Sequence, residues 1–321
     1  MAFTRLPDKP FTVSEYNFSG PGMFRGVGGI MTGAMGAIQG WSALWRFAYA
    51  HRLENMFDGE GTAGYFDVST DPLSQASDRA SICLFLRRDL AVAKDRVGAS
   101  VTAGEVGNLS DRAMTVTPSW WSAAWKSQVG TSASTAAQPG RQLVPNAEAY
   151  GTNALTALAS VTNVPSALVI DQDRGSFTVD TERTVGGFAE SGRIEAGPFA
   201  AEITGAAATV WVSALDREPV SASRRLLLTH LTDVQNTGVR YAERARKTLL
   251  SWGKLPYLVR VGQADVTLAL NAPETYAVYA LATNGRRTEK VETKVADGKL
   301  AFTAAVAAKD GARMLYEIVR E

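Results

Sequence analysis

From about residue 166 onward the chain is a series of short segments rich in β-branched and aromatic residues. This series limits the possible folds more than any other feature of the sequence. ATVWVSALD at 208–216 and RMLYEIVRE at 313–321 are two of the segments. Asn-Gly and Asp-Gly pairs favour two-residue hairpin turns. Short, evenly spaced strands joined by such turns predict an antiparallel β-sandwich domain over 166–321. The hairpin turns are expected at Asn284-Gly285, Asp297-Gly298 and Asp310-Gly311.

Two stretches inside this region need separate interpretation. VRYAERARKTLLSWG at 239–253 predicts a helix, because Tyr241, Ala245, Thr248 and Leu249 fall on one helical face and Gly253 is a plausible C-cap. Just before it, His230, Asp233 and Asn236 recur at three-residue spacing, which leaves a metal or catalytic site open. The alternation in LLLTHLT and the helix-start character of Thr232-Asp233 instead favour a structural strand followed by a capped turn.

Residues 1–95 alternate between strand and helix patterns. Residues 11–16 predict a strand, the small apolar residues 28–41 predict a helix packed closely on a sheet, and 43–51 predict a second strand. Asp71-Pro72 is a helix-start signal, and the helix is expected to end near Arg88-Asp89. This order is typical of parallel α/β architecture, although two such units cannot close a barrel by themselves.

Residues 96–165 are less regular and predict an irregular or helical connector. PSWWSAAWKSQVG at 118–130 favours a helix or an aromatic patch. Trp120, Trp121 and Trp125 could form a carbohydrate platform, but Trp121 and Trp125 share a helical face, which favours core packing between domains.

The composition excludes several classes of protein. There are 33 basic and 32 acidic residues, so no nucleic-acid or anionic-membrane partner is indicated, and the short basic run at 244–247 is expected to be a solvated face. One cysteine, Cys83, allows no intrachain disulfide and is expected to be buried, and two histidines make a histidine-rich metal site improbable. We therefore expect no cofactor. No membrane-spanning run or signal peptide is recognised, so the chain as written is expected in the cytoplasm, while a full-length parent could be secreted.

The segment 5–90 resembles the C-terminal end of the catalytic barrel in retaining glycoside hydrolases of the large (β/α)₈ clan, clan A type. KPFTVSEYN resembles their seventh strand, and QGWSALWRFAYAH resembles the next helix and the eighth strand. FDVSTDPLSQASDRASICLFLRRDL resembles the closing loop and last helix. The remaining segments resemble the β-rich domains that follow the barrel in large bacterial polysaccharide-degrading enzymes. The resemblance implies a partial (β/α) barrel-type segment over 1–95, followed by the β-sandwich.

The resemblance also implies a carbohydrate site at the ends of the first two strands. Glu15 occupies the place of the catalytic nucleophile, with a surface glutamate as the alternative from the residues alone. Tyr16, Asn17 and Trp45 would orient a sugar, because aromatic faces stack on pyranose rings and amides bond hydroxyls; for Trp45, core packing is equally open. His51 would hydrogen-bond a sugar or Glu15, although a structural histidine is favoured.

Retaining hydrolysis needs a second carboxyl group about 5–5.5 Å from the nucleophile, acting as acid and then as base. In the family this residue usually follows an asparagine, and the sequence contains no Asn-Glu pair. Asp58, Glu60 and Asp67 lie in a loop at the expected edge, but their spacing marks none as the partner. The first strand resembles a late barrel strand, so we expect about six of the eight strands of such a barrel to be absent before it.

The sequence therefore predicts a glycoside hydrolase-related protein that acts on a polysaccharide and is a truncated or incomplete catalytic unit. The alternatives are a non-catalytic carbohydrate-binding or structural module, or a barrel completed by another polypeptide. Two βα units would leave apolar residues uncovered, including Ile30 and Ile38, unless the chain's own β-domain packs over them. A homodimer through the exposed α/β segment is the favoured way to cover them.

Overall fold

A computed structural model of the chain describes residues 2–56, 65–100, 123–132, 142–145, 167–171, 173–309 and 311–321. The chain forms two compact units, each gathered from separate stretches of sequence. The domain boundaries expected at residues 95 and 165 stay a prediction. The first unit comprises Met1–Tyr16, Ala34–Trp45 and Leu90–Leu168, and the second comprises Asn17–Gly33, Arg46–Asp89 and Val169–Glu321.

The first unit holds the short parallel sheets. Strands β1 and β2 form a two-stranded sheet, and β3, β4 and β5 form a parallel sheet in the order β4-β3-β5. The expected irregular or helical connector over 96–165 is therefore wrong where the structure describes it, because strands of this region pair in parallel. Trp125 is buried, and Trp120 and Trp121 lie outside the described residues. The elements are η1 (Ala2–Thr4), β1 (Thr12–Tyr16), β2 (Ala43–Arg46), β3 (Arg96–Ser100), β4 (Gln128–Ser132) and β5 (Gln142–Pro145).

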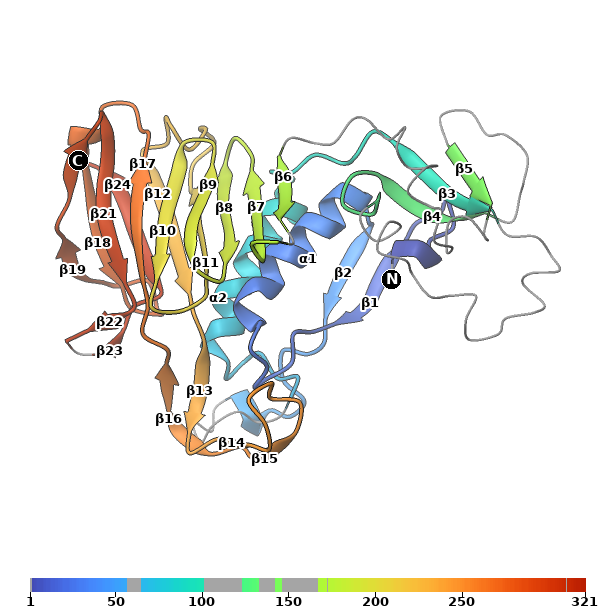
Figure 1. Ribbon diagram of the computed structural model, residues 1–321, viewed down its shortest axis with the longest axis horizontal. Helices are drawn as coiled ribbons and strands as arrows, with labels where there is room; N and C mark the ends of the chain where they lie inside the picture. The colour runs from blue at the N-terminus through green and yellow to red at the C-terminus, as the bar shows by residue number, and fades with distance from the viewer. Residues whose placement is uncertain are drawn as a thin grey trace. The chain divides into compact units, whose positions relative to one another are not determined.

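The second unit is dominated by two large antiparallel sheets (Figure 1). The larger has eight strands in the order β19-β18-β24-β12-β11-β8-β7-β6, and the smaller has five in the order β20-β21-β17-β10-β9. The antiparallel sheets expected from 166 onward are confirmed. Their strands are β6 (Leu168–Asp171), β7 (Ser176–Asp180), β8 (Thr184–Ala189), β9 (Gly192–Ala196), β10 (Phe199–Thr204), β11 (Ala208–Ala214), β12 (Arg225–Leu231), β17 (Gln263–Leu268), β18 (Tyr276–Leu281), β19 (Arg287–Val291), β20 (Lys294–Ala296), β21 (Lys299–Ala305) and β24 (Leu315–Arg320).

The core of this unit lies between the two sheets. Val210 and Val212 of β11 and Leu226 and Leu228 of β12 pack there with Val266 and other apolar residues of the five-stranded sheet. Neighbouring residues on β11 and β12 point to the opposite face, because side chains alternate along a strand. That face is also buried: all seven residues of β11 are buried, and Trp211 is 0% exposed. The eight-stranded sheet is thus covered on both faces at its centre.

Helix α2 (Pro72–Ser81) and the first part of α1 (Arg25–Gln39) contribute to the second covering layer. Helix α2 contacts β12, and a Cβ atom on Gly26 would lie 3.2 Å from Cβ of Leu231. Asp71 caps α2 by accepting hydrogen bonds from the amides of Leu73 and Ser74 at 3.1 and 3.2 Å. The helix start predicted at Asp71-Pro72 is therefore confirmed. A π-helical segment, η3 (Ile82–Leu86), continues the helix, and Cys83 within it is buried as expected.

The glycines of α1 allow it to approach α2 closely, instead of the sheet predicted from the sequence. Ser77 Oγ accepts a hydrogen bond from the amide of Gly29 at 2.9 Å and donates to the carbonyl of Gly26 at 3.0 Å. Ser81 Oγ donates to the carbonyl of Gly29 at 2.7 Å. A Cβ atom on Gly29 would lie 1.8 Å from the carbonyl oxygen of Ser77, so only glycine fits this position.

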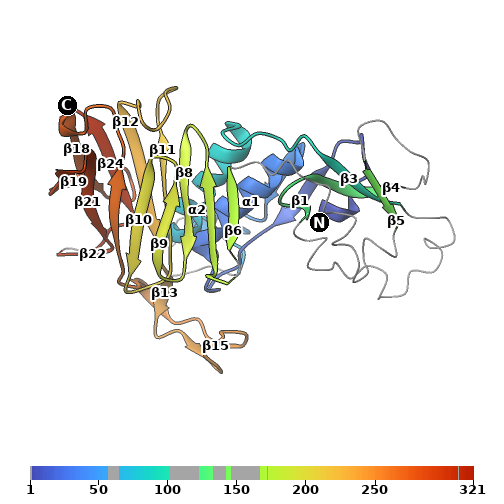
Figure 2. The same ribbon diagram turned by 45° about the horizontal axis from the view of Figure 1, so that its top comes forward.

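The helix expected over 239–253 is wrong. Tyr241 instead pairs with Leu249 in a hairpin of β14 (Arg240–Tyr241) and β15 (Leu249–Ser251). This hairpin lies at the tip of a longer one, made of β13 (Val234–Thr237) and β16 (Lys254–Val259), which projects beyond the two sheets in both views (Figures 1 and 2). The physical reason is tertiary: Arg246 bends back to an ion pair with Asp233 at 2.7 Å.

Strands β8, β9 and β10 were not predicted, because their segment is rich in glycine and alanine. The glycines are required by close approach between strands. A Cβ atom on Gly187 would lie 1.9 Å from the carbonyl oxygen of Phe177 on β7, and Gly186 has φ +140° beside β11.

The predicted hairpin turns are confirmed where the structure describes them. Asp297 and Gly298 join β20 to β21 with φ of 51° and 70°. Asn284-Gly285 joins β18 to β19, whereas Asp310 lies outside the described residues.

Two of the apolar residues expected to lie uncovered are fully buried within the chain. Ile30 and Ile38 of α1 are each 0% exposed, so that part of the expectation is wrong. The chain itself therefore covers both residues without a second copy. A homodimer stays a prediction.

No helix in the described part of the chain is long and apolar enough to cross a membrane. The short elements not yet placed are η2 (Glu54–Met56), η4 (Pro273–Thr275), β22 (Ala307–Ala308) and β23 (Gly311–Ala312).

Candidate functional site

Glu15 lies at the end of β1, in the first unit. Strands β1 and β2 pair with one another, and the amide of Ser42, just before β2, donates to the carbonyl of Phe11, just before β1, at 2.8 Å. Their arrows run in the same direction in Figure 1, so the carboxyl ends of both strands meet at one edge. Glu15 and Trp45 are each the penultimate residue of their strand, and both are exposed. The predicted pairing of a Glu15 strand with the strand near Leu44 is confirmed.

Trp45 of β2 and Tyr16, the next residue after Glu15, differ in accessibility. The side chain of Trp45 is 60% exposed, so its indole ring is open to a ligand, and the core-packing alternative for Trp45 is wrong. Tyr16 is half-buried at the last position of β1. Strand β2 ends at Arg46, five residues before the end of the predicted 43–51 strand, and the peptide bond between Phe47 and Ala48 is cis.

Asn17 and His51 belong to the second unit, and both have partners there. The side-chain amide of Asn17 donates to the backbone carbonyls of Phe66, at 2.9 Å, and of Phe47. His51 pairs through Nδ1 with Asp67, and its ring packs edge-on against Phe47 with centroids 5.2 Å apart. Both side chains therefore organise the loop after β2. The predicted roles of Asn17 and His51 in sugar binding stay predictions.

The second catalytic carboxyl group is not identified by these contacts. Of the three acidic residues considered, Asp67 is fully buried against His51, and Asp58 and Glu60 lie outside the described residues. Asp78 on α2 is perturbed: burial raises the pKa of its carboxyl group to about 6, opposed by Arg46, whose Nη1 lies 3.1 Å away. Within the described ranges, no group of three or more His, Cys, Asp or Glu residues could hold a metal ion.

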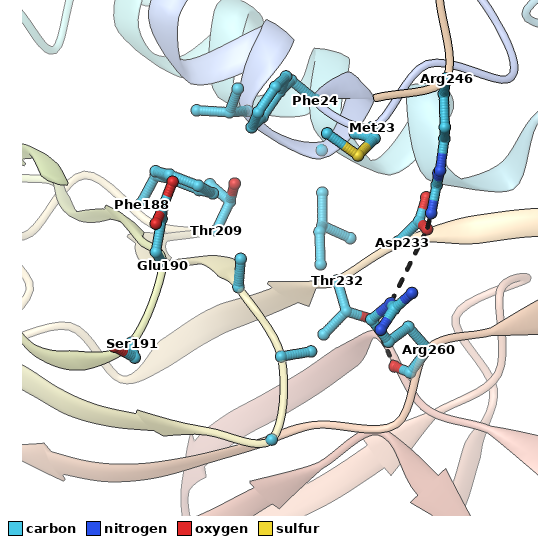
Figure 3. A pocket seen from close by; sticks show the side chains of 16 residues that line it. Met23, Phe24, Phe188, Glu190, Ser191, Thr209, Thr232, Asp233, Arg246 and Arg260 are labelled. Carbon is cyan, nitrogen blue, oxygen red and sulfur yellow. Dashed lines mark hydrogen bonds and ion pairs between the residues drawn. The ribbon is translucent and has the colours of Figure 1, made fainter. Parts of the chain in front are cut away.

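A cavity of about 540 Å³ in the second unit was not predicted from the sequence (Figure 3). It lies among the start of α1, the β8–β9 and β10–β11 turns, and the segment that links β12 to β13. Phe24 and Phe188 line one side, with ring centroids 6.4 Å apart and planes at 77°. Asp233, Arg246 and Arg260 line the other side.

Asp233 is the centre of the polar side. Its Oδ2 atom accepts hydrogen bonds from Arg246 Nη2 at 2.7 Å and from Gln235 Nε2 at 2.8 Å, and Arg260 Nε lies 4.0 Å away. The side chains of Asp233 and Arg246 are 12% and 11% exposed. Arg246 was expected on a solvated basic face, and that expectation is wrong. Arg246 lies thirteen residues after Asp233, a spacing that matches neither the helix repeat nor the strand repeat. The sequence pattern therefore did not indicate this ion pair, which forms because the hairpin brings the two residues together.

The His230, Asp233 and Asn236 series does not form a common site. His230 is fully buried in β12 and directs Nδ1 to the carbonyl of Ala304 at 2.9 Å, whereas Asp233 pairs with Arg246. Burial lowers the pKa of His230 to about 4, so the ring is neutral at pH 7 and Nδ1–H donates the bond. The three residues therefore do not share a site. LLLTHLT forms a strand as predicted, whereas residues 232 and 233 lead directly into strand β13 instead of the predicted capped turn.

Comparison with known proteins adds no assignment. No family model, no curated protein and no solved structure matches the chain.

Proposed function

We propose that the chain is a glycoside hydrolase-related protein that acts on a polysaccharide, with Glu15 as the nucleophile of a retaining reaction. One observation supports this most directly. Glu15 lies exposed at the carboxyl end of β1, and β1 is joined through α1 to its parallel partner β2. In barrels built from such units, catalytic side chains come from this end of the strands.

The chemistry assigned to Glu15 is attack on the anomeric carbon of a sugar. The carboxylate forms a covalent glycosyl intermediate while the leaving oxygen receives a proton from a second carboxyl group, which later activates water. The exposed indole of Trp45, at the equivalent position of β2, offers a flat apolar face for a pyranose ring. Two carboxyl groups are sufficient for this reaction, so the proposal needs no metal or cofactor.

We expect the chain by itself to hydrolyse unactivated polysaccharide weakly or not at all. Among the described residues, the sheet that carries Glu15 has two strands, whereas a closed barrel of this type has eight. The acid/base residue of the family comes from one of the other strands. Without a positioned acid, a poor leaving group departs unprotonated, and general acid catalysis typically contributes about 10²–10⁴-fold.

A nucleophile without its acid can still be detected with an activated substrate. A 2,4-dinitrophenyl 2-deoxy-2-fluoro glycoside has a leaving group that needs no protonation, and its fluorine slows release of the intermediate. We expect intact-mass spectrometry to show one added glycosyl group, and peptide mapping to place it on Glu15. Glu15→Gln should abolish the adduct, and Glu274→Gln, which changes an exposed glutamate on another element, should not.

Two results would contradict the proposal in different ways. Failure of every activated glycoside to label Glu15 would favour the alternative of a non-catalytic carbohydrate-binding or structural module. Turnover of an unactivated polysaccharide that Glu15→Gln abolishes would support the nucleophile but contradict the expected incompleteness. The acid would then have to be sought in this chain.

A further inference from the structure

Residues 234–260, which include β13 to β16, form a projecting arm with a strongly uneven charge (Figures 1 and 2). Six of the chain's 33 basic residues but only one of its 32 acidic residues lie in this arm, so its net charge is +5 against +1 for the whole chain. The acidic residue, Glu243, is half-buried and accepts a hydrogen bond from the amide of Thr248 at 2.7 Å. Every exposed charged residue of the arm is therefore basic: Arg240, Arg244, Lys247, Lys254 and Arg260.

Asp233 precedes the arm and offsets only part of its charge. Asp233 Oδ2 accepts a hydrogen bond from Arg246 Nη2 at 2.7 Å and lies 4.0 Å from Arg260 Nε, so two guanidinium groups share one carboxylate. The bond to Arg246 brings the loop at the tip of the arm back toward Arg260 at its base. Arg244 and Lys247 lie in that loop and are exposed, and the side chain of Arg260 is 59% exposed. These three cations are therefore accessible to a partner in solution.

Aromatic residues fix the arm against the rest of its unit. The hydroxyl of Tyr257 donates to the backbone carbonyl of Thr70, and Trp252 packs against Tyr65 with ring centroids 4.8 Å apart. Because the backbone of the arm is held in place, binding has to order only its basic side chains, which limits the entropy cost. Tyr65 is 51% exposed, so its ring adds a flat apolar face beside the arm.

The charge and the surface of the arm limit the class of partner. A cluster of like charges attracts a partner with several opposite charges. Nucleic-acid-binding domains are usually strongly basic as a whole, whereas this chain has a net charge of +1. Binding at a lipid surface buries a continuous apolar face, whereas β16 exposes Lys254, Pro256 and Leu258 in turn. An acidic polysaccharide combines spaced negative charges with apolar C–H faces that pack on an aromatic ring.

We propose that the arm binds an anionic polysaccharide, one that carries carboxylate or sulfate groups. The choice of a polysaccharide rests on the proposed function, and the arm adds that this polysaccharide is charged. Its anionic oxygens accept hydrogen bonds from the exposed cations Arg244, Lys247 and Arg260, and such charge-assisted bonds are the stronger kind. A pyranose ring packs on the exposed face of Tyr65. The arm thereby retains the polymer and takes no part in breaking its bonds.

The test measures binding of the full chain by bio-layer interferometry. Polygalacturonate and dextran sulfate are the carboxylated and sulfated probes, and neutral dextran is the uncharged one. We expect binding to at least one acidic polymer and none to dextran. Raising the salt concentration from about 0.01 M to about 1 M shortens the Debye length from about 30 Å to about 3 Å, so it should weaken binding by roughly tenfold or more.

The double variant Arg244→Gln with Lys247→Gln removes two exposed cations of the arm and should weaken binding roughly fivefold or more. Arg286→Gln with Lys294→Gln is the matched control, because both residues are exposed in the same unit outside the arm and the net charge changes equally. We expect this control to bind as the unmodified chain does. Circular dichroism checks that each variant is folded.

The contact with the sugar ring is tested by Tyr65→Ala, which should weaken binding several-fold. Tyr279→Ala, which truncates a tyrosine of the same unit outside the arm, should not. Single-stranded poly(dT) and vesicles that contain phosphatidylserine are measured in the same assay, and we expect both to bind more weakly than the acidic polysaccharide.

Four outcomes would overturn the proposal: no binding to either acidic polymer, equal binding to dextran, equal losses in the arm variant and its matched control, or tighter binding to poly(dT) or to the vesicles. Binding that is lost in the arm variant and retained in the control supports it. Glu15→Gln should leave this binding unchanged. Labelling of Glu15 without polymer binding would therefore refute the arm alone, and polymer binding without labelling would refute the nucleophile alone.

Discussion

Replacing Gly29 with alanine should destabilise the protein by about 2–4 kcal/mol, although alanine is the better helix former. Gly29 lies in α1 at the contact with α2, where it bonds to Ser77 and Ser81. The new methyl carbon would lie 1.8 Å from the carbonyl oxygen of Ser77 and 2.3 Å from its carbonyl carbon. These are backbone atoms, so no side-chain rotation can relieve the overlap.

The magnitude follows from three opposing terms. Exchange of glycine for alanine in a helix interior gains about 1 kcal/mol. Ordinary contact begins near 3.4 Å, so α2 would have to move by more than 1.5 Å, and overpacking of a core typically costs about 1–3 kcal/mol or more. The same movement stretches the two hydrogen bonds of Ser77 Oγ to α1, each contributing about 1 kcal/mol net. The losses exceed the gain.

Urea denaturation followed by far-UV circular dichroism and tryptophan fluorescence measures this change. Thr32→Ala is the matched control on the same helix, since Thr32 is half-buried and its truncation adds no atoms at the contact. We expect this control to stay within about 1 kcal/mol of the unmodified protein. A Gly29→Ala protein as stable as, or more stable than, the unmodified chain would refute the close helix contact.

Two further changes test the buried polar groups by the same denaturation assay. Asp71→Ala should lower the free energy of unfolding by about 3–5 kcal/mol, because it leaves the 3%-exposed Arg25 without its carboxylate partner. Loss of the helix cap alone would lower it by roughly 1 kcal/mol, so a measured decrease of only about 1 kcal/mol would contradict this expectation. Burial lowers the pKa of His230 to about 4 in the folded state, against an ordinary value of 6.5, so the unfolded chain binds the proton first as the pH falls. Its contribution is therefore complete above pH 6.5 and is lost as the pH falls toward 4, by up to about 3 kcal/mol relative to His230→Gln; a difference between the two proteins that does not change with pH would argue against the burial effect.

Local signals in the sequence determined those features that depend on a few neighbouring residues. Asp71-Pro72 starts α2 because an aspartate side chain reaches the next amides and proline suits the first turn. Asp297-Gly298 forms a hairpin turn because both residues adopt positive φ at low cost. The strand ending in Glu15 and its pairing with the strand near Leu44 also followed from sequence order, because a strand, a helix and a strand form one right-handed unit.

The tertiary structure decided the features that depend on residues distant in sequence. The segment 239–253 has a helical pattern, yet the ion pair of Arg246 with Asp233 and the pairing of Tyr241 with Leu249 hold it as a hairpin. Gly187 lies in a strand because β7 passes too close for any side chain, which no local propensity records. The cavity likewise joins Phe24, near the start of the sequence, with Asp233, more than 200 residues later. Propensity acts over a few residues, whereas burial and charge pairing act through space, and in these places the longer-range terms exceed the local ones.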